Sequence, residues 1–475
     1  MAVRRLKLRE QSQSRRRHLA LAKETAYGAP MHQPHLEDLL AFLRFASVST
    51  DPERSSDVTA CAVWLAEKLR TIGLAVELRP TGGHPIVLAR NAHQPGRRTV
   101  MIYGHYDVQP PDPLELWHAP PFEPVVKGDV VFARGATDNK GQILAHVLGV
   151  AETLREHGDL PVNLIFLIEG EEEIGSTHLE EFLTAQREEL RCDVIAISDT
   201  GMVAPGVPTL TYGLRGIAAL ELKVTGPATD LHSGIFGGAV ANPATVLTRL
   251  VASLHDAEGR VAVNGFYEGV APIAAWESSM WKRLPMGDAE IAQVTGVPQL
   301  AGEAGFSSLE RIWARPTAEL NGIGGGFQGK GTKTVIPREA FAKLTFRLVP
   351  GQNPAAVMTA VRAHLRERCP ASVRLEITGG HAGEPYLTDP HSAAGQAAQR
   401  ALQRTFGRDI ALIREGGSIP IVNTFRKVLG VDSLLLGLAL PDCRAHAPNE
   451  NFPLENFFTG IRLNRALLEE LAHAG

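Results

Sequence analysis

Two different spacings of hydrophobic residues alternate along residues 35–200. Residues 35–46 and 57–72 place apolar side chains every three to four positions, which is the spacing of amphipathic helices. Short apolar runs typical of buried strands follow, at residues 76–78, 86–89, 99–103, 130–133, 162–168 and 194–198. Helical spacing returns between the last three runs, at residues 141–156 and 177–189. This strand–helix–strand order predicts an α/β domain whose mostly parallel sheet is covered by helices on both faces.

The pattern changes from Tyr212 onward. Strands are predicted at residues 218–225, 340–348 and 372–378, and helices at residues 354–368 and after Asn242-Pro243. Two helices among about four strands predict an α+β unit of the ferredoxin-like type. After residue 389 the earlier spacing returns, with helices predicted at residues 392–406 and 454–472 and a buried strand at residues 433–440. A smaller domain is therefore inserted into the α/β domain. The predicted parts are a basic extension at residues 1–30, the α/β domain at 31–208 and 390–475, and the inserted domain at 209–389.

The composition is that of a soluble globular protein of two or three domains. The chain has 475 residues, of which 44% are hydrophobic and 21% are charged. No apolar run approaches the ~18 residues of a membrane-spanning helix, so no membrane partner is expected. The four cysteines share no Cys-x-x-Cys spacing, and so few in so long a chain indicate a reducing, cytoplasmic location.

Charge is unevenly distributed along the chain. Residues 1–30 carry eight Lys or Arg and two Glu residues, hence a formal charge of +6, whereas the whole chain carries −4. Residues 31–475 therefore carry −10, which argues against nucleic acid as the main partner. The basic extension is interpreted as a solvated segment rather than as a binding tail.

Titratable residues follow five of the predicted buried strands. They are His105, Asp107, Asp138, Glu171, Glu172, Glu173, Asp199 and His446. Open α/β sheets carry their sites outside the carboxyl ends of the strands, so these side chains are expected to converge. A Glu-Glu-Glu run alone is usually the charged start of a helix. Its occurrence together with two histidines and three further carboxylates at strand ends favours a functional site.

This set of side chains is typical of a metal site. Two imidazoles with several carboxylates and no thiolate suit Zn²⁺, Mn²⁺ or Co²⁺. Two ions ~3.5–4 Å apart need a bridging carboxylate, for which Asp138 is the natural candidate. His105 and Asp107 are two positions apart, on one side of an extended chain, so Asp107 can orient the ring of His105. Of Glu172 and Glu173, which point apart, one can bind metal and the other can act as a general base.

These residues lie in motifs that resemble a known superfamily, the dinuclear metallopeptidases. The motifs are Gly104-His105-Tyr106-Asp107, Gly135-Ala136-Thr137-Asp138-Asn139-Lys140-Gly141 and Glu172-Glu173-Ile174-Gly175-Ser176, with the later Asp199 and His446. The superfamily contains carboxypeptidase G2-like enzymes, aminoacylases and carnosinases. Further segments look most like its cytosolic non-specific dipeptidase branch: Asp230-Leu231-His232-Ser233-Gly234, Lys333-Thr334-Val335-Ile336-Pro337, Phe346-Arg347-Leu348-Val349-Pro350 and Arg414-Glu415-Gly416-Gly417-Ser418-Ile419-Pro420. The resemblance covers about residues 35–470.

The resemblance implies a role for each residue of the metal site. Five residues would bind two divalent ions, Zn²⁺ or Mn²⁺ with Co²⁺ as a further option: His105, Asp138, Glu173, Asp199 and His446. Asp138 would bridge the ions, Asp107 would orient His105, and Glu172 would be the general base. The peptide bond between Asp138 and Asn139 would be cis.

The resemblance also implies substrate-binding residues in the inserted domain and near it. His232 would stabilise the developing oxyanion, and Arg347 and His381 would bind the substrate carboxylate, for which the fork of an arginine is suited. Gly417 and Ser418 belong to a glycine-rich turn whose backbone N–H groups suit an anion. Thr334 is a weaker candidate of the same kind. Residues 324–329 formally fit a nucleotide-binding G-x-G-x-x-G pattern, but no strand precedes them and no helix follows, so a loop is predicted.

The predicted function is metal-dependent hydrolysis of the peptide bond in dipeptides or very short peptides. One alternative keeps the site but changes the substrate to an N-acyl or N-carbamoyl amino acid. Another is a catalytically inactive binding or regulatory protein, which the loss of Glu172 or of a metal ligand would mark, and none of them is missing. In the resembling dipeptidases the inserted domain serves as a lid and forms a dimer. The resemblance therefore predicts a homodimer in which His232 acts in the partner's site.

Overall fold

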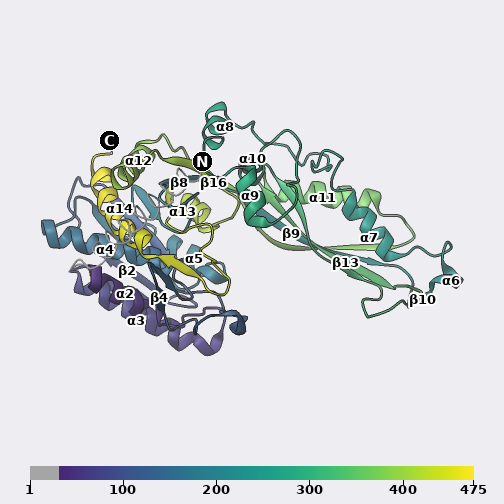
Figure 1. The fold of residues 1–475 in the computed structure, drawn as a ribbon, viewed down its shortest axis with the longest axis horizontal. Coiled ribbons are helices and arrows are strands. Elements are labelled where there is room, and N and C mark those ends of the chain that lie inside the picture. Colours follow the sequence, from purple (N-terminus) through teal and green to yellow (C-terminus); the bar gives the residue numbers. More distant parts are fainter. Residues whose placement is uncertain (1–31, 475) are drawn as a thin grey trace, which may run out of the picture. The chain divides into compact units, whose positions relative to one another are not determined.

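The computed structural model describes residues 32–474, drawn in Figure 1, and the basic extension predicted at residues 1–30 lies outside them. The chain divides into two compact units. Unit 1 comprises the described residues up to Phe182 together with Ala196–Asp199 and Leu438–His473. Unit 2 consists mainly of Leu183–Ile195 and Thr200–Gly437. Over residues 32–474, no helix is long and apolar enough to cross a membrane.

Unit 1 is built on a largely buried sheet. Its strands are neighbours in the order β1 (Ala75–Arg79), β2 (Ile86–Arg90), β6 (Asn163–Glu169), β3 (Thr99–His105) and β7 (Val194–Ile197). The first half of β7 is assigned to unit 2 and its second half to unit 1. β3 and β6 are parallel, whereas β1–β2 and β2–β6 are antiparallel. Every residue of β6 and β7 is buried, as expected for strands covered on both faces. The register places His105 opposite Glu169, so β3 and β6 end side by side.

Four helices pack around this sheet: α2 (His32–Leu43), α3 (Ser55–Thr71), α4 (Lys140–His157) and α14 (Leu454–Ala472). α3 contacts β1 and β2, α4 contacts β3, and α4 and α14 lie side by side (Figure 1). A Cβ at Gly149 would come within 2.9 Å of the Ile461 carbonyl oxygen, so glycine permits the close approach of these two helices. Shorter elements are η1 (Pro52–Arg54), η2 (Leu114–Leu116), η3 (Glu172–Ile174) and α5 (Leu179–Ala185).

A second, antiparallel sheet in unit 1 connects two distant parts of the chain. Its strands are β18 (Asn451–Pro453), β5 (Val130–Phe132) and β4 (Val125–Lys127), in that order. The register pairs Asn451 with Phe132. Because β5 leads into the segment that carries Asp138, and β18 follows the segment that carries His446, this pairing brings the two segments together.

Unit 2 contains one group of strands around β8 (Thr209–Leu214). β16 (Ala411–Glu415) is parallel to β8, whereas β15 (Tyr386–Leu387) and β17 (Ser433–Leu436) are antiparallel to it. Helices of this part are α8 (Ala275–Trp281), α9 (Asp288–Thr295), α10 (Ser308–Ala314), α12 (Ala393–Phe406) and α13 (Ile421–Leu429). α8 and α10 contact β16, α12 contacts β8 and β17, and α13 contacts β17.

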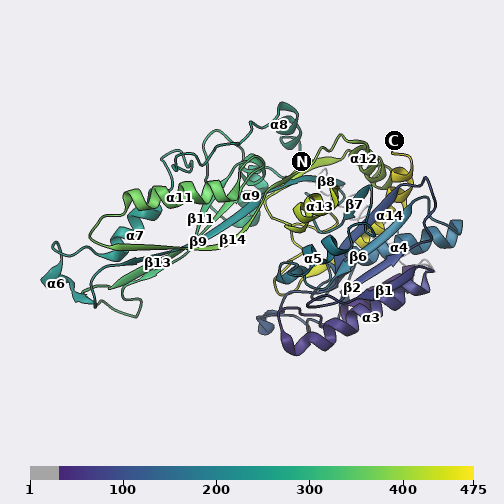
Figure 2. The same cartoon turned by 180° about the vertical axis from the view of Figure 1, so that it is seen from behind.

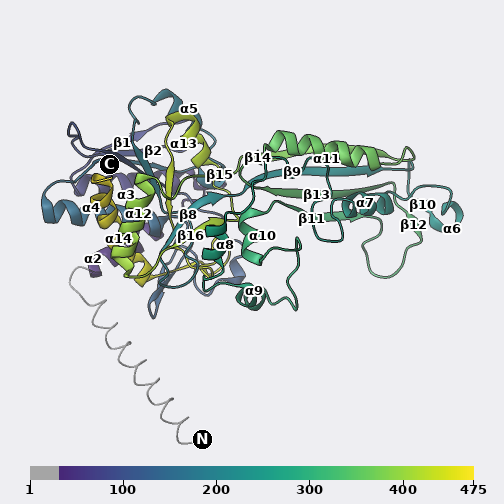
Figure 3. The ribbon, with the colours of Figure 1, turned by 90° about the horizontal axis from the view of Figure 1, so that it is seen from above.

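A separate antiparallel sheet in unit 2 has the order β11 (Thr317–Gly325), β13 (Glu339–Leu348), β9 (Gly216–Thr225) and β14 (Arg374–Gly383). Two helices, α7 (Pro243–Ala252) and α11 (Pro354–Arg368), lie along these strands in Figure 2, and α11 runs the length of β9 in Figure 3. β9 contributes Leu220 and Leu222 to the core beneath the helices, α7 contributes Leu247, and α11 contributes Val361. Alternate residues of β9 therefore face one apolar layer.

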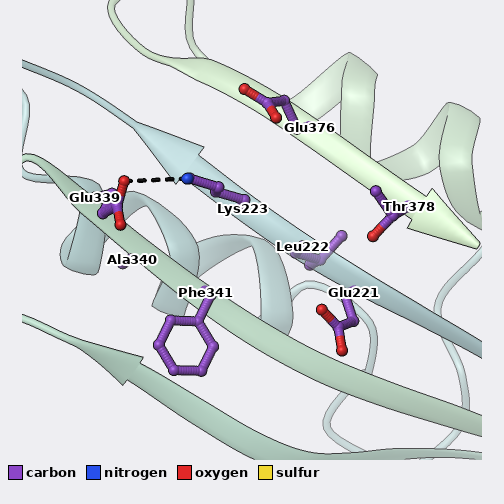
Figure 4. Close-up of a pocket in the computed structure, with 8 residues that line it drawn as sticks. All are labelled: Glu221, Leu222, Lys223, Glu339, Ala340, Phe341, Glu376 and Thr378. Atoms are coloured by element: carbon purple, nitrogen blue, oxygen red, sulfur yellow. Dashed lines mark ion pairs between the residues drawn. The ribbon is translucent and has the colours of Figure 1, made fainter.

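The other face of this sheet carries charged side chains beside the exposed Phe341. A hollow of about 300 Å³ lies there. Figure 4 labels the residues that line it: Glu221, Leu222, Lys223, Glu339, Ala340, Phe341, Glu376 and Thr378. Lys223 forms an ion pair with Glu339 across β9 and β13. At one end of the unit, β10 (Leu231–His232) pairs with β12 (Val335–Ile336), and α6 (Ser233–Phe236) follows β10.

The α/β prediction is confirmed, and the predicted helix at residues 141–156 is α4 (Lys140–His157). The helix predicted at residues 177–189 is shorter, because α5 covers only Leu179–Ala185. The strand predicted at residues 433–440 also ends early, at Leu436. The stretch at residues 324–329 begins at the end of β11, so the prediction that no strand precedes it was wrong. It continues into a connection to β12 and no helix follows, so the predicted loop is confirmed and the nucleotide-binding arrangement is absent there.

Candidate metal centre

His105 stands at the end of β3 with its ring fully buried. Its Nδ1 donates a hydrogen bond to the carbonyl oxygen of Asp107 at 3.1 Å and lies 3.3 Å from Oδ1 of Asp107. Its Nε2 makes no hydrogen bond, yet it lies 3.2 Å from Oδ1 of Asp138 and 3.9 Å from Oδ2 of Asp199. A ring nitrogen whose lone pair faces two carboxylates requires a proton or a metal ion between them. The buried donor set therefore fits a divalent metal ion.

Asp138 lies between the two histidines. Its Oδ2 is 2.9 Å from Nε2 of His446, on the side opposite the contact of Oδ1 with His105. His446 Nε2 is in turn 3.5 Å from Oε2 of Glu173. The ligand atoms of His105, Asp138 and Glu173 all lie within 4.8 Å of one another. The two oxygens of Asp138 thus face two different imidazoles, as a bridging carboxylate must.

The electrostatics of the cluster favour a cation. Burial, with the charge of Asp138 beside them, raises the pKa of Glu173 to about 8 and that of Asp199 to about 7. Burial also raises the pKa of Glu172 well above its usual value, and the charges of Asp199 and Asp138 add to this effect. Burial alone would raise the pKa of Asp138, but the two neighbouring histidines hold it below its usual value. Crowded carboxylates of this kind are stabilised by a bound metal ion.

Asp107 links three parts of the site. It is fully buried, and its carboxylate accepts hydrogen bonds from the Ser49 hydroxyl at 2.7 Å and from the backbone N–H groups of Glu172 at 3.3 Å and Glu173 at 3.1 Å. The same carboxylate lies beside Nδ1 of His105. Asp107 therefore contacts both the ring of His105 and the backbone of the η3 turn.

In unit 2, the structure brings His232 and Thr334 together. His232 ends β10, opposite Val335 of β12, and the N–H of Ser233 donates to the carbonyl oxygen of Thr334 at 3.1 Å. Nδ1 of His232 accepts a hydrogen bond from the N–H of Gly234 at 2.9 Å. The ring proton is therefore on Nε2, which makes this exposed histidine a hydrogen-bond donor.

Arg347 and Ser418 form a second pair in unit 2. Nη1 of Arg347 donates to the Ser418 hydroxyl at 3.4 Å, and that hydroxyl donates to the carbonyl oxygen of Arg215 at 2.5 Å. Gly417 precedes Ser418, and a Cβ added there would meet open space. His381 lies in an irregular stretch of β14 between Gly379 and Ala382, and within residues 32–474 its side chain makes no hydrogen bond or ion pair.

Comparison with known proteins decides the family. The family model described as peptidase family M20/M25/M40 matches residues 101–470. The chain belongs to peptidase family M20. This finding confirms the resemblance that the sequence motifs showed.

Relatives of this M20 chain include named dipeptidases. It is 34% identical over 444 residues to a Cys-Gly metallodipeptidase of Schizosaccharomyces pombe, covering 90% of this chain and 93% of the relative. It is 31% identical over 482 residues to the Beta-Ala-His dipeptidase of Mus musculus, covering 96% and 97% of the two chains.

Solved structures agree with this placement in the M20 family. Human carnosine dipeptidase 1 superposes with a TM-score of 0.78 at 30% identity, covering 93% of this chain and 96% of that chain. An M20 family metallo-carboxypeptidase from Sulfolobus solfataricus superposes with a TM-score of 0.81 at 31% identity, covering 92% and 99%.

Glu450, a residue that sequence reasoning missed, holds the segment that carries Asp138. This buried carboxylate accepts hydrogen bonds from three backbone N–H groups at 2.9–3.0 Å, those of Gly135, Thr137 and Asp138, and from Nη1 of Arg134 at 2.7 Å. It therefore fixes the backbone that presents Asp138. In the sequence, Glu450 is marked only as an acidic residue two positions before Phe452.

Asn139 is a second residue that sequence reasoning did not assign to the site. Its side-chain amide donates to the carbonyl oxygen of Ser198 at 2.6 Å and to Oδ1 of Asp199 at 2.9 Å. The peptide bond between Asp138 and Asn139 is cis, as the resemblance implied. Asn139 therefore contacts Asp199, one candidate ligand, and directly follows Asp138, another candidate ligand.

Proposed function

We propose that this M20 chain is a metal-dependent dipeptidase that hydrolyses the peptide bond of dipeptides or very short peptides. The observation that carries the proposal is the cluster of histidines and carboxylates around Asp138, in a chain that matches named dipeptidases over at least 90% of its length. The family membership makes it a hydrolase. A cytoplasmic location is part of the proposal, because all four cysteines are free thiols.

The cluster suits two divalent ions, Zn²⁺ or Mn²⁺ and also Co²⁺. His105 and Asp199 would hold one ion together with Asp138. His446 and Glu173 would hold the other, also together with Asp138. Divalent ions at such a site supply Lewis acidity to the scissile carbonyl group and to the attacking water.

Glu172 is the proposed general base. It belongs to the η3 turn, next to Glu173, and both backbone N–H groups are held by Asp107. Its pKa is raised by burial and then by the neighbouring carboxylates, so its carboxylate gains a proton readily. Glu172 takes a proton from the attacking water and afterwards delivers it to the leaving amine.

The candidate residues of unit 2 would bind the substrate. His232 would donate from Nε2 to the developing oxyanion, and preorganised donors of this kind stabilise the transition state. Arg347 and His381 would bind the C-terminal carboxylate of the substrate. Further contacts to the substrate are proposed for Ser418, Gly417 and Thr334. The hydrogen bond between Arg347 and Ser418 supports the assignment of Ser418.

Free-amine and blocked substrates distinguish this proposal from the amidohydrolase alternative. Ala-Ala and Gly-Gly are compared with N-acetyl- and N-carbamoyl-alanine, with Zn²⁺, Mn²⁺ or Co²⁺ added to the purified protein. The proposal predicts hydrolysis of the dipeptides and little hydrolysis of the blocked amino acids. Hydrolysis of the blocked amino acids alone would instead identify an amidohydrolase, and no hydrolysis of any compound would favour a binding protein.

Amidation of the substrate's C-terminus tests the carboxylate contacts. If Arg347 and His381 bind that carboxylate, a dipeptide amide loses at least one hydrogen bond to a charged group, which costs about 1.5–3 kcal/mol in kcat/KM. The measurement compares Ala-Ala with Ala-Ala amide in the wild-type protein and in Arg347→Met, where the difference should shrink. Equal kcat/KM values for acid and amide would remove these residues from carboxylate binding.

The inserted domain at residues 209–389 is proposed as a lid and dimerisation domain, through which His232 serves the site of a partner subunit. Beside His232, Ile235 is 71% exposed and Phe236 is 40% exposed in the isolated chain, which suits burial against another subunit. A homodimer with exchanged histidines follows from this proposal.

Mixing two inactive variants tests the exchange. In a mixed dimer of His232→Ala and Glu172→Ala, the subunit that retains Glu172 receives the intact His232 of its partner. Random pairing makes about half of the dimers mixed, so roughly a quarter of all sites should regain activity. If exchange of subunits is verified by mass spectrometry and no activity returns, each His232 serves its own chain.

A further inference from the structure

Two neighbouring arginines of unit 2, Arg215 and Arg347, lie half-buried without an acidic partner. Within residues 32–474 neither guanidinium forms an ion pair. Nε of Arg215 donates to the carbonyl oxygen of Gly416 at 3.1 Å, and Nη1 of Arg347 donates to the hydroxyl of Ser418. Both acceptors are neutral, and the charge of Glu319 offsets only part of that of Arg215. A half-buried charge without an ion-pair partner is costly.

The protein holds the two guanidinium groups in place. The Ser418 hydroxyl contacts both residues, because it accepts from Arg347 and donates to the carbonyl oxygen of Arg215. A Cβ at position 416 would lie 2.9 Å from Nη2 of Arg215, so glycine lets that guanidinium lie against the backbone. Burial, and then the charge of Arg347, lower the pKa of Arg215 to about 10. A pKa of about 10 leaves Arg215 cationic at neutral pH.

Both arginines line a cavity of about 750 Å³, a volume in the range of small-molecule sites. Its other charged lining residues are Arg311, Arg315, Glu303 and Glu319. Glu303 is occupied by Arg315, with two hydrogen bonds of 2.7 Å. Four arginines against two glutamates leave a formal charge of +2 on the lining. One carboxylate neutralises half of this excess, whereas a dicarboxylate neutralises all of it.

We propose that Arg215 and Arg347 form a dicarboxylate site, which gives the enzyme a preference for peptides whose C-terminal residue is glutamate or aspartate. The inference rests on the proposed function, because it assigns the α-carboxylate of the substrate to this site. The side-chain carboxylate supplies the second negative charge. Arg215 is thus a specificity-determining residue, and its fork provides the two parallel donors that a carboxylate accepts.

An isosteric pair of substrates tests the charge preference. Ala-Glu and Ala-Gln have the same shape and differ by one negative charge. We expect kcat/KM to be about tenfold or more higher for Ala-Glu, the range of a hydrogen bond to a charged group. In Arg215→Met the ratio of the two values should fall below about threefold. Arg374→Met, which removes an exposed arginine of β14 in the same unit, should leave the ratio unchanged.

Calorimetry with glutarate tests the site without catalysis. The metal-loaded protein should bind glutarate at least about tenfold more tightly than its monoamide, and Arg215→Met should remove the difference. Arg215-dependent binding of glutarate without cleavage of any dipeptide would support a site for free dicarboxylates while refuting the proposed function. Cleavage of both dipeptides at equal kcat/KM, with no Arg215-dependent binding of glutarate, would overturn the inference and leave the dipeptidase proposal standing. Thermal unfolding of each variant verifies that it is folded.

Discussion

Replacing Glu172 by glutamine should lower kcat by about 10²–10⁴-fold, the range expected for loss of a general base. Glutamine keeps the size of the side chain and its hydrogen-bonding atoms but accepts no proton from water. The backbone N–H of residue 172 still donates to Asp107, so the η3 turn keeps its position. Because Glu172 is not among the proposed ligands, the metal content should stay unchanged.

The measurement is kcat for a dipeptide, with bound metal determined on the same samples. Glu181→Gln is the matched control, because Glu181 is an exposed glutamate of the nearby helix α5. Near-normal turnover of Glu172→Gln would remove this residue from the mechanism. A parallel loss of metal would instead place it among the ligands.

Replacing Asp107 by asparagine should weaken metal binding about 10–100-fold, as is typical for groups that orient a ligating histidine. The carboxylate of Asp107 lies 3.3 Å from Nδ1 of His105 and also holds the backbone of Glu173. Asparagine removes the charge and replaces one acceptor oxygen by a donor, which is mismatched to the Ser49 hydroxyl and the backbone N–H groups. Both the ring and the η3 turn therefore lose part of their support.

Titration of the metal-free protein against a chromogenic chelator measures this affinity. Ser49→Ala provides a graded comparison, because it removes one hydrogen bond of 2.7 Å to Asp107 and keeps the charge. The metal affinity of Ser49→Ala should therefore fall by less than that of Asp107→Asn. Equal metal affinities for wild type and Asp107→Asn would show that Asp107 does not orient His105.

The position of the metal cluster was predictable because it depends on strand ends. β3 and β6 are adjacent, parallel and buried, so the residues that follow them meet at one edge of the sheet. The spacing of hydrophobic residues and the apolar composition identify such strands in the sequence. His105, Asp138 and Glu173 were therefore found before any geometry was known, and the structure brings them together.

Residues that act through long-range contacts were not predictable in this way. Glu450 reaches the backbone of Asp138 only because β18 pairs with β5 in one particular register, more than 300 positions apart in sequence. Arg215 became notable only when the structure showed no ion pair for it within residues 32–474 and placed it beside Arg347 in one cavity. Side-chain partners of this kind follow from tertiary packing, which hydrophobic spacing does not encode.

The spacing of hydrophobic residues also did not predict the short helices. The helices α8, α9 and α10 have seven or eight residues each, which is too short for a clear helical period. α10 is instead defined at its start by Ser307 and Glu310, whose side chains and backbone N–H groups bond to one another. This capping box is readable in the sequence when it is sought directly.

Hydrolysis of a dipeptide as a function of bound metal tests the central claim most directly. Metal-free protein is titrated with Zn²⁺ or Mn²⁺, and the initial rate is recorded against the equivalents bound per chain. The account predicts no hydrolysis without metal and a rate that rises until two equivalents are bound, with Asp138→Ala inactive throughout. Hydrolysis at the full rate by metal-free protein, with residual metal excluded by elemental analysis, would contradict it.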